Sequence, residues 1–323
     1  MKPPILCIGP FIDAIIKPLE ERYELHRIYV DTPIVPGLPE WQPIRAVVTG
    51  GVVGAKREII EALPSLELIA INGVGTDAVD LELCRARGIT VKTLTDGLVT
   101  AGATTAVDGS RSDMLTDDVA DMAMGLLLSA ARGVSFGDGF VRTGKWGREA
   151  FPPGTRVTGK RVGIYGLGRI GKAVARRAAG FDTEVAYTSR RPVEGVPWRR
   201  SATIGELAAW ADFLVLCAPA NPDSIGAVDA GVLAALGPTG ILVNVARGAL
   251  VDEEALVAAL ASGTIRAAGL DVFRNEPKVP EALLTMPNVA LTPHQGSSKE
   301  TKEKMSEILV AIVDDHYGAA APA

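Results

Sequence analysis

The sequence feature that constrains this chain most is the pattern G-x-G-x-x-G formed by Gly166, Gly168 and Gly171. The apolar run 162–165 before it is typical of a buried strand, and residues 172–179 after it favour a helix. At such a turn the first glycine allows the bend, the second lets a pyrophosphate approach the backbone, and the third lets the helix pack on the strand. The helix N-terminus, with Arg169 and Ile170, offers N–H groups to phosphates. The pattern predicts a dinucleotide site, although such turns also occur without a nucleotide.

Apolar strands that alternate with helices follow this turn. Six strands are expected in the second half of the chain, at Arg161–Tyr165, Glu184–Thr188, Phe213–Cys217, Ile241–Val245, Ala267–Val272 and Val289–Thr292. This alternation, with the glycine turn after its first strand, is typical of the doubly wound parallel sheet of a Rossmann domain.

The first part of the chain repeats the alternation, with strands expected at Ile5–Ile8, Ala46–Val48, Leu68–Ile71 and Ile89–Val91. With 323 residues the chain is long enough for two cores, because a single core usually splits beyond about 250 residues. We therefore expect an α/β chain of two Rossmann-like domains. These are a flavodoxin-like substrate-binding domain, 1–115, completed by 297–323 through a last helix Lys299–Tyr317, and an NAD(P)-binding domain, 116–296.

Composition excludes several classes of partner. The net charge of −5 argues against a nucleic-acid footprint, and the pairs Arg190-Arg191 and Arg199-Arg200 are too short to change this. No segment reaches the roughly 18 apolar residues of a membrane span, and the N-terminal apolar run is too short for a signal peptide. We expect a soluble cytoplasmic protein without a metal site. Its cysteines lack C-x-x-C spacing and are expected to be buried reduced thiols: Cys7, Cys84 and Cys217.

Three side chains are candidates for chemistry. His294 follows the last expected strand, and ligands of parallel sheets bind at the carboxyl ends of strands. Arg247 also follows a strand, and its guanidinium matches a carboxylate bidentately. Glu276 is a possible partner of His294 that would favour the imidazolium. The alternatives are a structural histidine, a capping arginine and a solvated loop glutamate.

Four motifs in order resemble one family. They are GLGRIG, NVARGALVDE, DVFRNEP and TPHQGSS, at 166–171, 244–253, 271–277 and 292–298. Together they closely resemble the D-isomer-specific 2-hydroxyacid dehydrogenases, especially their glyoxylate/hydroxypyruvate and hydroxyphenylpyruvate reductase branch. The likeness runs from about residue 45 to about residue 309, with further matches at 72–77 and 115–121.

The resemblance implies roles for the candidate residues. Arg247 would bind the carboxylate of a 2-oxo acid and polarise its carbonyl, while the backbone N–H groups of Val74 and Gly75 hold the same carboxylate. His294 would protonate the carbonyl oxygen as hydride arrives from the nicotinamide, with Glu276 keeping the imidazole charged. Formate dehydrogenases of the same superfamily have Gln at the position of Glu276, which argues against that activity.

The resemblance also implies residues at the cofactor, namely Thr116, Ala246 and Asp271, with Asp271 at the nicotinamide amide. An NAD site also expects an acid about 20 residues after the glycine turn, whereas this chain has Ser189, Arg190 and Arg191. A serine and two cations suit a 2′-phosphate, since each charge-assisted hydrogen bond contributes about 1.5–3 kcal/mol. We therefore predict NADPH (NADP+) as the cofactor.

Alternatives to an NADPH-dependent reductase remain open. The arginines would then form a solvated turn, and the enzyme would be an NAD-dependent D-2-hydroxyacid or phosphoglycerate dehydrogenase. A dinucleotide-sensing interaction protein is the alternative from another class, since corepressors with this fold exist.

The segment after residue 97 carries the expected subunit contacts. Thr116 is a plausible N-cap of helix 117–132, which is apolar nearly all round and suits a core or a subunit interface. We expect a homodimer through residues 116–132. Trp146 falls where the reductase branch places a tryptophan of a neighbouring subunit near the substrate, with plain packing as the alternative. Leu98–Ser112 is an insertion relative to the family, either a flap at the cleft mouth or a surface loop without catalytic consequence.

Overall fold

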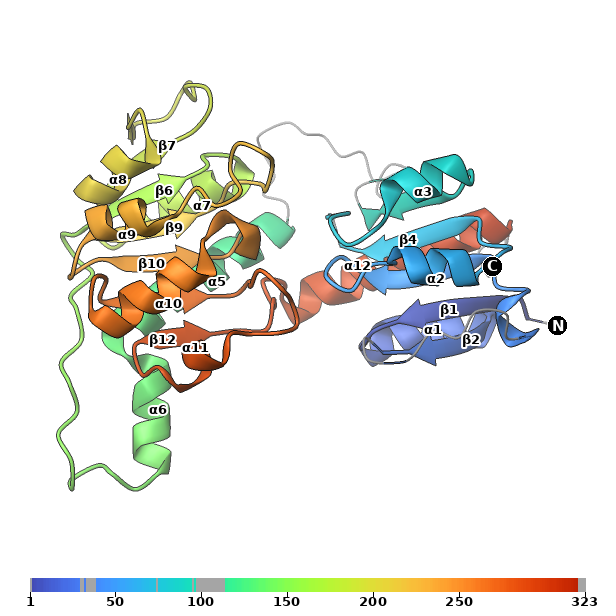
Figure 1. The fold of residues 1–323 in the computed structure, drawn as a ribbon, viewed down its shortest axis with the longest axis horizontal. Coiled ribbons are helices and arrows are strands. Elements are labelled where there is room, and N and C mark those ends of the chain that lie inside the picture. The colour runs from blue at the N-terminus through green and yellow to red at the C-terminus, as the bar shows by residue number, and fades with distance from the viewer. Residues whose placement is uncertain are drawn as a thin grey trace. The chain divides into compact units, whose positions relative to one another are not determined.

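The chain folds into two α/β units (Figure 1). The computed structural model describes residues 2–29, 32, 39–73, 75–94, 96 and 114–318. Contacts divide the chain into unit 1, Met1–Arg111 with Lys299–Ala323, and unit 2, Ser112–Ser298. A parallel sheet in each unit confirms the expected fold class. The domain boundaries expected after residues 115 and 296 stay a prediction.

Unit 1 has the strand order expected of a flavodoxin-like domain. Its described strands form one parallel sheet in the order β2-β1-β3-β4-β5, which is the flavodoxin order 2-1-3-4-5. The strands are β1 (Pro4–Ile8), β2 (Glu24–Ile28), β3 (Ala46–Gly50), β4 (Leu68–Asn72) and β5 (Thr90–Thr93). The helical elements are α1 (Asp13–Arg22), η1 (Pro39–Trp41), α2 (Arg57–Ala62), α3 (Leu81–Ala86) and α12 (Lys299–Tyr317).

The last helix, α12, belongs to the core of unit 1. Its buried face includes Leu309 and Val313, which lie in one apolar cluster with Ile5 of β1 and Leu68 of β4. A second cluster on the other face of the sheet includes Ile60 of α2. Both faces of this sheet are therefore covered, as a parallel sheet requires.

Unit 2 has the Rossmann strand order with one strand added. Its described sheet runs β12-β11-β10-β9-β6-β7-β8, so that in chain order the strands lie as 7-6-5-4-1-2-3. The strands are β6 (Arg161–Tyr165), β7 (Glu184–Thr188), β8 (Arg199–Arg200), β9 (Phe213–Leu216), β10 (Ile241–Asn244), β11 (Ala267–Leu270) and β12 (Val289–Leu291). The helical elements are α5 (Met114–Arg132), α6 (Val134–Arg142), α7 (Arg169–Ala179), α8 (Ile204–Trp210), α9 (Ala230–Leu236), η2 (Gly248–Leu250), α10 (Glu253–Ser262) and α11 (Glu281–Thr285).

The strand order of unit 2 reverses beside β6. The chain leaves β6 toward β7 on one side and returns to β9 on the other. Ligands of open parallel sheets bind at the carboxyl ends of the strands at such a switch point. All the strand pairs of this sheet are parallel, so every loop that follows a strand reaches the same edge.

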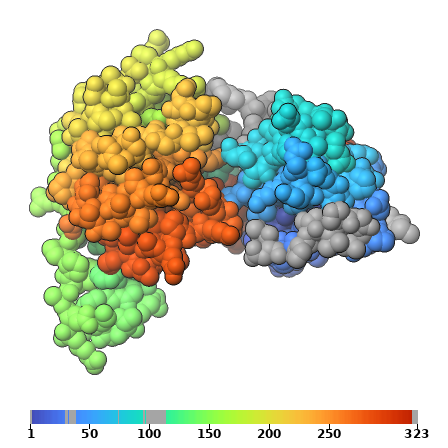
Figure 2. All heavy atoms as spheres, viewed as in Figure 1, coloured from blue at the N-terminus to red at the C-terminus, as the bar shows by residue number. Residues whose placement is uncertain are grey.

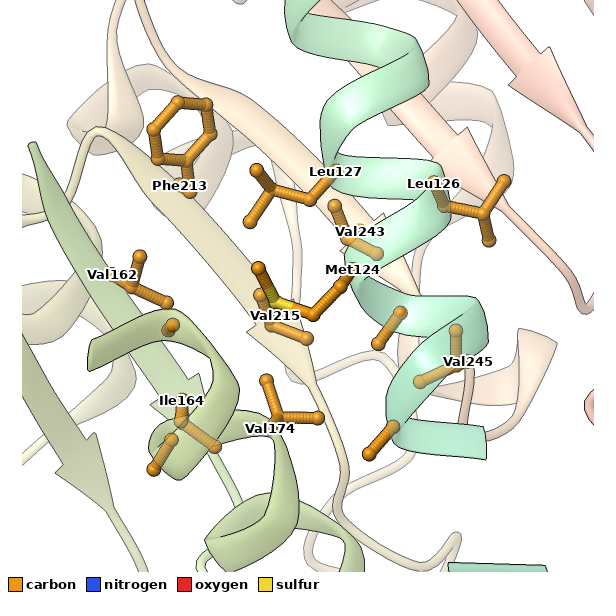
Figure 3. Close-up of a cluster of buried hydrophobic side chains, with 14 of the residues drawn as sticks. Met124, Leu126, Leu127, Val162, Ile164, Val174, Phe213, Val215, Val243 and Val245 are labelled. Carbon is orange, nitrogen blue, oxygen red and sulfur yellow. The ribbon is translucent and has the colours of Figure 1, made fainter. Parts of the chain in front are cut away.

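Helix α5 is packed mainly within its own unit. Figure 3 shows Met124 and Leu127 facing Val215 and Val243 of the sheet. The helix begins at Met114, which makes Thr116 its third residue and not its N-cap, so the predicted start was wrong. The apolar surface that indicated a core or an interface is thus used largely by the core of unit 2.

Helix α6 and the segment after it stand away from the sheet of unit 2 (Figures 1 and 2). Large apolar side chains are exposed there: Trp146 is 78% exposed, Val134 59% and Val141 53%. Rings of Phe136, Phe140 and Phe151 hold the returning segment to α6, with centroids 5.3–6.4 Å apart. This segment, 134–151, is called the α6 arm below.

The three cysteines are free thiols, as the sequence predicted. Cys7 and Cys84 are buried, Cys217 is half-buried, and burial raises the pKa values of the Cys7 and Cys217 thiols to about 12. In the described part of the chain no group of three acidic, histidine or cysteine side chains is placed to hold a metal ion. No single described helix is long and apolar enough to cross a membrane; α5 and α6 pass that test only as a pair bent by 61°.

Candidate functional site

The glycine turn after β6 is tight at two glycines and open at the third. Gly166 has φ +98°, and a Cβ there would lie 2.6 Å from the Ala218 nitrogen. A Cβ on Gly171 would overlap the Gly166 carbonyl oxygen. Gly168, which precedes α7, has no atom within 4 Å of its Cβ position. The fold itself therefore needs the first and third glycines, whereas the second leaves open space at a helix N-terminus.

The first turn of α7 carries the other predicted residues of this loop. Arg169 is exposed, and Ile170 is half-buried against the core of unit 2. The N-cap residue of α7 is Gly168, which has no side chain to accept a hydrogen bond from the first N–H groups of the helix.

The turn after β7 is held by an arginine that the sequence analysis did not single out. Arg200 of β8 donates from Nη2 to the Ser189 carbonyl oxygen at 2.9 Å. The Ser189 hydroxyl donates to the Arg191 carbonyl oxygen at 2.6 Å, which closes the turn, while Arg190 and Arg191 are exposed. The pair Arg199-Arg200 is visible in the sequence, but the sequence analysis considered it only as a possible nucleic-acid surface.

Arg247 follows β10 on a backbone fixed by a buried amide. Asn244 is 1% exposed; its Nδ2 donates to the Arg247 carbonyl oxygen at 2.9 Å and its Oδ1 accepts from the Ala246 N–H at 3.1 Å. Arg247 is half-buried, and its Nη1 donates to the Ala246 carbonyl oxygen at 2.7 Å. Both predicted residues of this loop thus lie at the carboxyl edge of the sheet.

His294 and Glu276 form the pair expected from the sequence. His294 Nδ1 lies 2.8 Å from Glu276 Oε2, with side chains 37% and 14% exposed. The other carboxylate oxygen of Glu276 accepts from the Phe273 N–H at 2.8 Å. His294 has φ +50°, a left-handed conformation that is uncommon outside glycine. Since Nδ1 faces the carboxylate, Nε2 is the ring nitrogen that can serve a substrate.

Asp271 joins the loops that carry this pair. It is 2% exposed, and its Oδ1 accepts from the Thr292 hydroxyl at 2.6 Å and the Gln295 N–H at 2.9 Å. Its carbonyl oxygen accepts from the His294 N–H at 2.9 Å. The buried carboxylate therefore fixes the turn that places His294.

The remaining predicted residues are on other elements or outside the described residues. Thr116 is buried in α5, and Trp146 is exposed on the α6 arm. Gly75 belongs to unit 1 and is half-buried. Val74 and the insertion Leu98–Ser112 lie outside the described residues.

Unit 2 thus brings an imidazole–carboxylate pair and an arginine to the edge that carries the glycine turn. Arg247, Glu276 and His294 follow β10, β11 and β12, which are neighbours in the sheet. Such a set is able to bind a carboxylate and to move one proton.

Comparisons with known proteins agree with this arrangement. Residues 124–296 match the family model of the D-isomer specific 2-hydroxyacid dehydrogenase NAD binding domain. The chain is 39% identical to the hydroxyphenylpyruvate reductase of Plectranthus scutellarioides, over 97% of this chain and 95% of that protein. It is 40% identical to the 2-ketogluconate reductase of Gluconobacter oxydans, over 96% and 94%.

A solved structure is similar over nearly the whole chain. It is the NADPH-dependent glyoxylate/hydroxypyruvate reductase of Sinorhizobium meliloti in complex with NADP and malonate, at 40% identity and a TM-score of 0.80, covering 98% of this chain and 94% of that one. The chain belongs to the D-isomer specific 2-hydroxyacid dehydrogenase family. The expected family and its reductase branch are confirmed, and this 2-hydroxyacid dehydrogenase is an oxidoreductase.

The glycine turn of this dehydrogenase generates a matched pair of substitutions. Gly168→Ala is expected to keep the fold and to weaken dinucleotide binding at least tenfold, because its methyl group enters open space where a pyrophosphate approaches. Gly171→Ala is expected to lower the free energy of unfolding by about 1–3 kcal/mol or more, because its Cβ overlaps backbone. Thermal unfolding and a dinucleotide titration by nicotinamide fluorescence measure both effects. Equal stability of the two variants would contradict the separate roles given to Gly168 in binding and to Gly171 in the fold.

Proposed function

We propose that this dehydrogenase uses NADPH to reduce a small 2-oxo acid to the D-2-hydroxy acid. The observation that carries the proposal is the 2.8 Å pair of His294 Nδ1 and Glu276 Oε2 on the sheet edge that also bears Arg247 and the glycine turn. A proton donor and a carboxylate anchor beside a dinucleotide motif are the groups that reduction of a 2-oxo acid needs.

The residues present fit a dinucleotide with a 2′-phosphate. The space at Gly168 and the N-terminus of α7 suit the pyrophosphate. Ser189, Arg190 and Arg191 come directly after Thr188, where an NAD site expects an acid, and both arginines are exposed. The S. meliloti relative, which was solved with NADP, supports the same choice.

The structure refines how this turn would select a phosphate. Because the Ser189 hydroxyl donates its hydrogen within the turn, the guanidinium groups of Arg190 and Arg191 are the stronger donors for a dianion. We infer that the serine shapes the turn and that the two arginines supply the charge.

When bound, NADPH supplies the hydride. Arg247 binds the substrate carboxylate and polarises the neighbouring carbonyl. His294 gives a proton to the carbonyl oxygen, and Glu276 holds the imidazole in the orientation that this requires. With a side chain that is 37% exposed, His294 regains its proton from solvent. Val74, Gly75, Thr116, Ala246 and Asp271 keep their expected binding roles as predictions.

The relatives indicate which 2-oxo acids to test as substrates. Their names give glyoxylate and hydroxypyruvate, hydroxyphenylpyruvate and 2-ketogluconate as substrates of those proteins. All are 2-oxo acids, which agrees with an arginine anchor for the carboxylate. Turnover with these four acids is the direct test, and absence of NADPH oxidation with every one would overturn the proposal.

We also propose that the enzyme is a homodimer. The α6 arm exposes several large apolar side chains in one short segment, which is typical of a protein interface. Helix α5, named by the sequence analysis, buries its apolar face in unit 2, so we place most of the dimer contact on the arm that continues from it.

His294→Ala is expected to lower kcat by about 10²–10⁴, because the carbonyl oxygen loses its proton donor. NADPH affinity should stay within twofold, as measured by nicotinamide fluorescence. His26→Ala, at a half-buried histidine of β2, is the matched control and should keep kcat. Comparable activity of the two variants would refute the role of His294.

Arg190→Ala with Arg191→Ala is expected to lower kcat/KM for NADPH by about 10²-fold or more, because two charge-assisted hydrogen bonds are lost. The value for NADH should change little, since its ribose carries no 2′-phosphate. Arg176→Ala removes an exposed arginine of α7 and should change neither value. A clear preference of the unaltered enzyme for NADH would be incompatible with the predicted cofactor.

Val141→Glu is expected to shift the enzyme from dimer to monomer in sedimentation velocity at micromolar concentration, because a charge replaces apolar contact on the α6 arm. Leu284→Glu is the matched control, since Leu284 is 60% exposed on α11 of the same unit. A monomeric unaltered enzyme, or dimers for both variants, would contradict the arm as the interface.

A further inference from the structure

The loop of Arg247 approaches the loop of Glu276 closely at Gly248. Gly248 is buried, and a Cβ there would overlap the carbonyl group of Phe273 and the nitrogen of Arg274. Only a residue without a side chain lets the two backbones approach so closely. The position of Arg247 is thereby coupled to the backbone that precedes Glu276.

A second contact fixes the same two loops. Glu253, the first residue of α10, accepts the Arg274 N–H on Oε1 at 2.7 Å. The preceding N–H, that of Phe273, is accepted by Glu276 Oε1 at 2.8 Å. Two successive amides of one turn are thus held by carboxylates from two different segments, and one of these carboxylates is the partner of His294.

Helix capping does not explain the side chain of Glu253. Asp252 already caps α10 by accepting from the Ala255 N–H at 3.1 Å. Glu254, in the same first turn, is exposed and supplies the same favourable charge at the helix N-terminus. Glu253 is half-buried and reaches across to Arg274, so its distinguishing contact is with the loop of Glu276.

We propose that Glu253 is a positioning residue for proton transfer in the reduction proposed above. By holding the Arg274 amide it fixes the turn 273–276, and the turn in turn fixes the Glu276 carboxylate against His294. A small displacement of a proton donor lowers the rate of proton transfer strongly. Glu253 is therefore expected to affect kcat although it does not contact the substrate.

The kinetic test compares two neighbouring glutamates. Glu253→Ala is expected to lower kcat about tenfold, because the turn that carries Glu276 loses one of its amide contacts, while KM for the 2-oxo acid and NADPH affinity change less than twofold. Glu254→Ala should leave all three values unchanged. Glu253→Gln keeps an oxygen acceptor for the amide and is expected to recover most of kcat. A KM effect without a kcat effect, or equal losses at 253 and 254, would overturn the proposal.

A double-substitution cycle tests whether Glu253 acts through Glu276. Once Glu276→Gln has loosened the histidine, Glu253→Ala should cost less than about twofold more, because residues that act as a unit are not additive. A full further tenfold loss in that background would show that Glu253 acts elsewhere and would overturn the proposal.

Amide exchange gives a readout that needs no activity. The Arg274 amide should lose its protection in Glu253→Ala and keep it in Glu254→Ala, as followed by two-dimensional NMR of the full chain. Unchanged protection in Glu253→Ala would show that Glu253 does not hold the Arg274 amide and would overturn the proposal. If protection is lost in Glu253→Ala but the unaltered enzyme reduces no 2-oxo acid, the proposed function is refuted. The contact between Glu253 and the Arg274 amide is then a structural feature only.

Discussion

A close approach of backbones at the end of β6 determines the geometry of unit 2. The carbonyl oxygen of Gly166 faces Gly171 with no room for a Cβ between them, and Gly166 also contacts Ala218, which follows β9. The Gly166 N–H donates to the Thr188 carbonyl oxygen at 2.8 Å, which ties in the end of β7. The exits of three strands and the start of α7 therefore meet at one point. The open space at Gly168 lies between these two tightly packed glycines.

The sequence was informative about this sheet and less informative about its edge. Apolar runs and glycine spacing predicted strands β6, β7, β9, β10, β11 and β12 because buried parallel strands have a strong local pattern. Strand β8 has two residues, Arg199 and Arg200, and exists through pairing with β7, which no local pattern encodes. The contact of Arg200 with Ser189 was missed for the same reason. In α5, Thr116 resembled an N-cap, but the helix already begins at Met114.

The candidate site divides along the same line. Residue type and position after a strand were enough to single out Arg247, Glu276 and His294, because few side chains bind a carboxylate or carry a proton near neutral pH. The backbone contacts that hold their loops were not predictable, although Asp271 was named for a different role. Asp271 and Glu253 act on backbone amides 21 to 24 residues away, and such contacts leave no spacing signal. Three acidic side chains thus fix the loops beside one histidine, which is the preorganisation that proton transfer requires.

The choice between the two nicotinamide dinucleotides is a local electrostatic one. The whole chain carries a net charge of −5, so overall charge does not attract a phosphate. The turn after β7 is locally positive because it carries Arg190, Arg191 and Arg200. Of these, Arg200 donates one hydrogen bond to the Ser189 carbonyl oxygen. Because exposed charges interact weakly over long distances in salt, selection for a 2′-phosphate must arise from direct hydrogen bonds at this turn. In the site proposed above, Arg200 and the Ser189 hydroxyl fix this backbone, which lowers the entropy lost when Arg190 and Arg191 bind the phosphate.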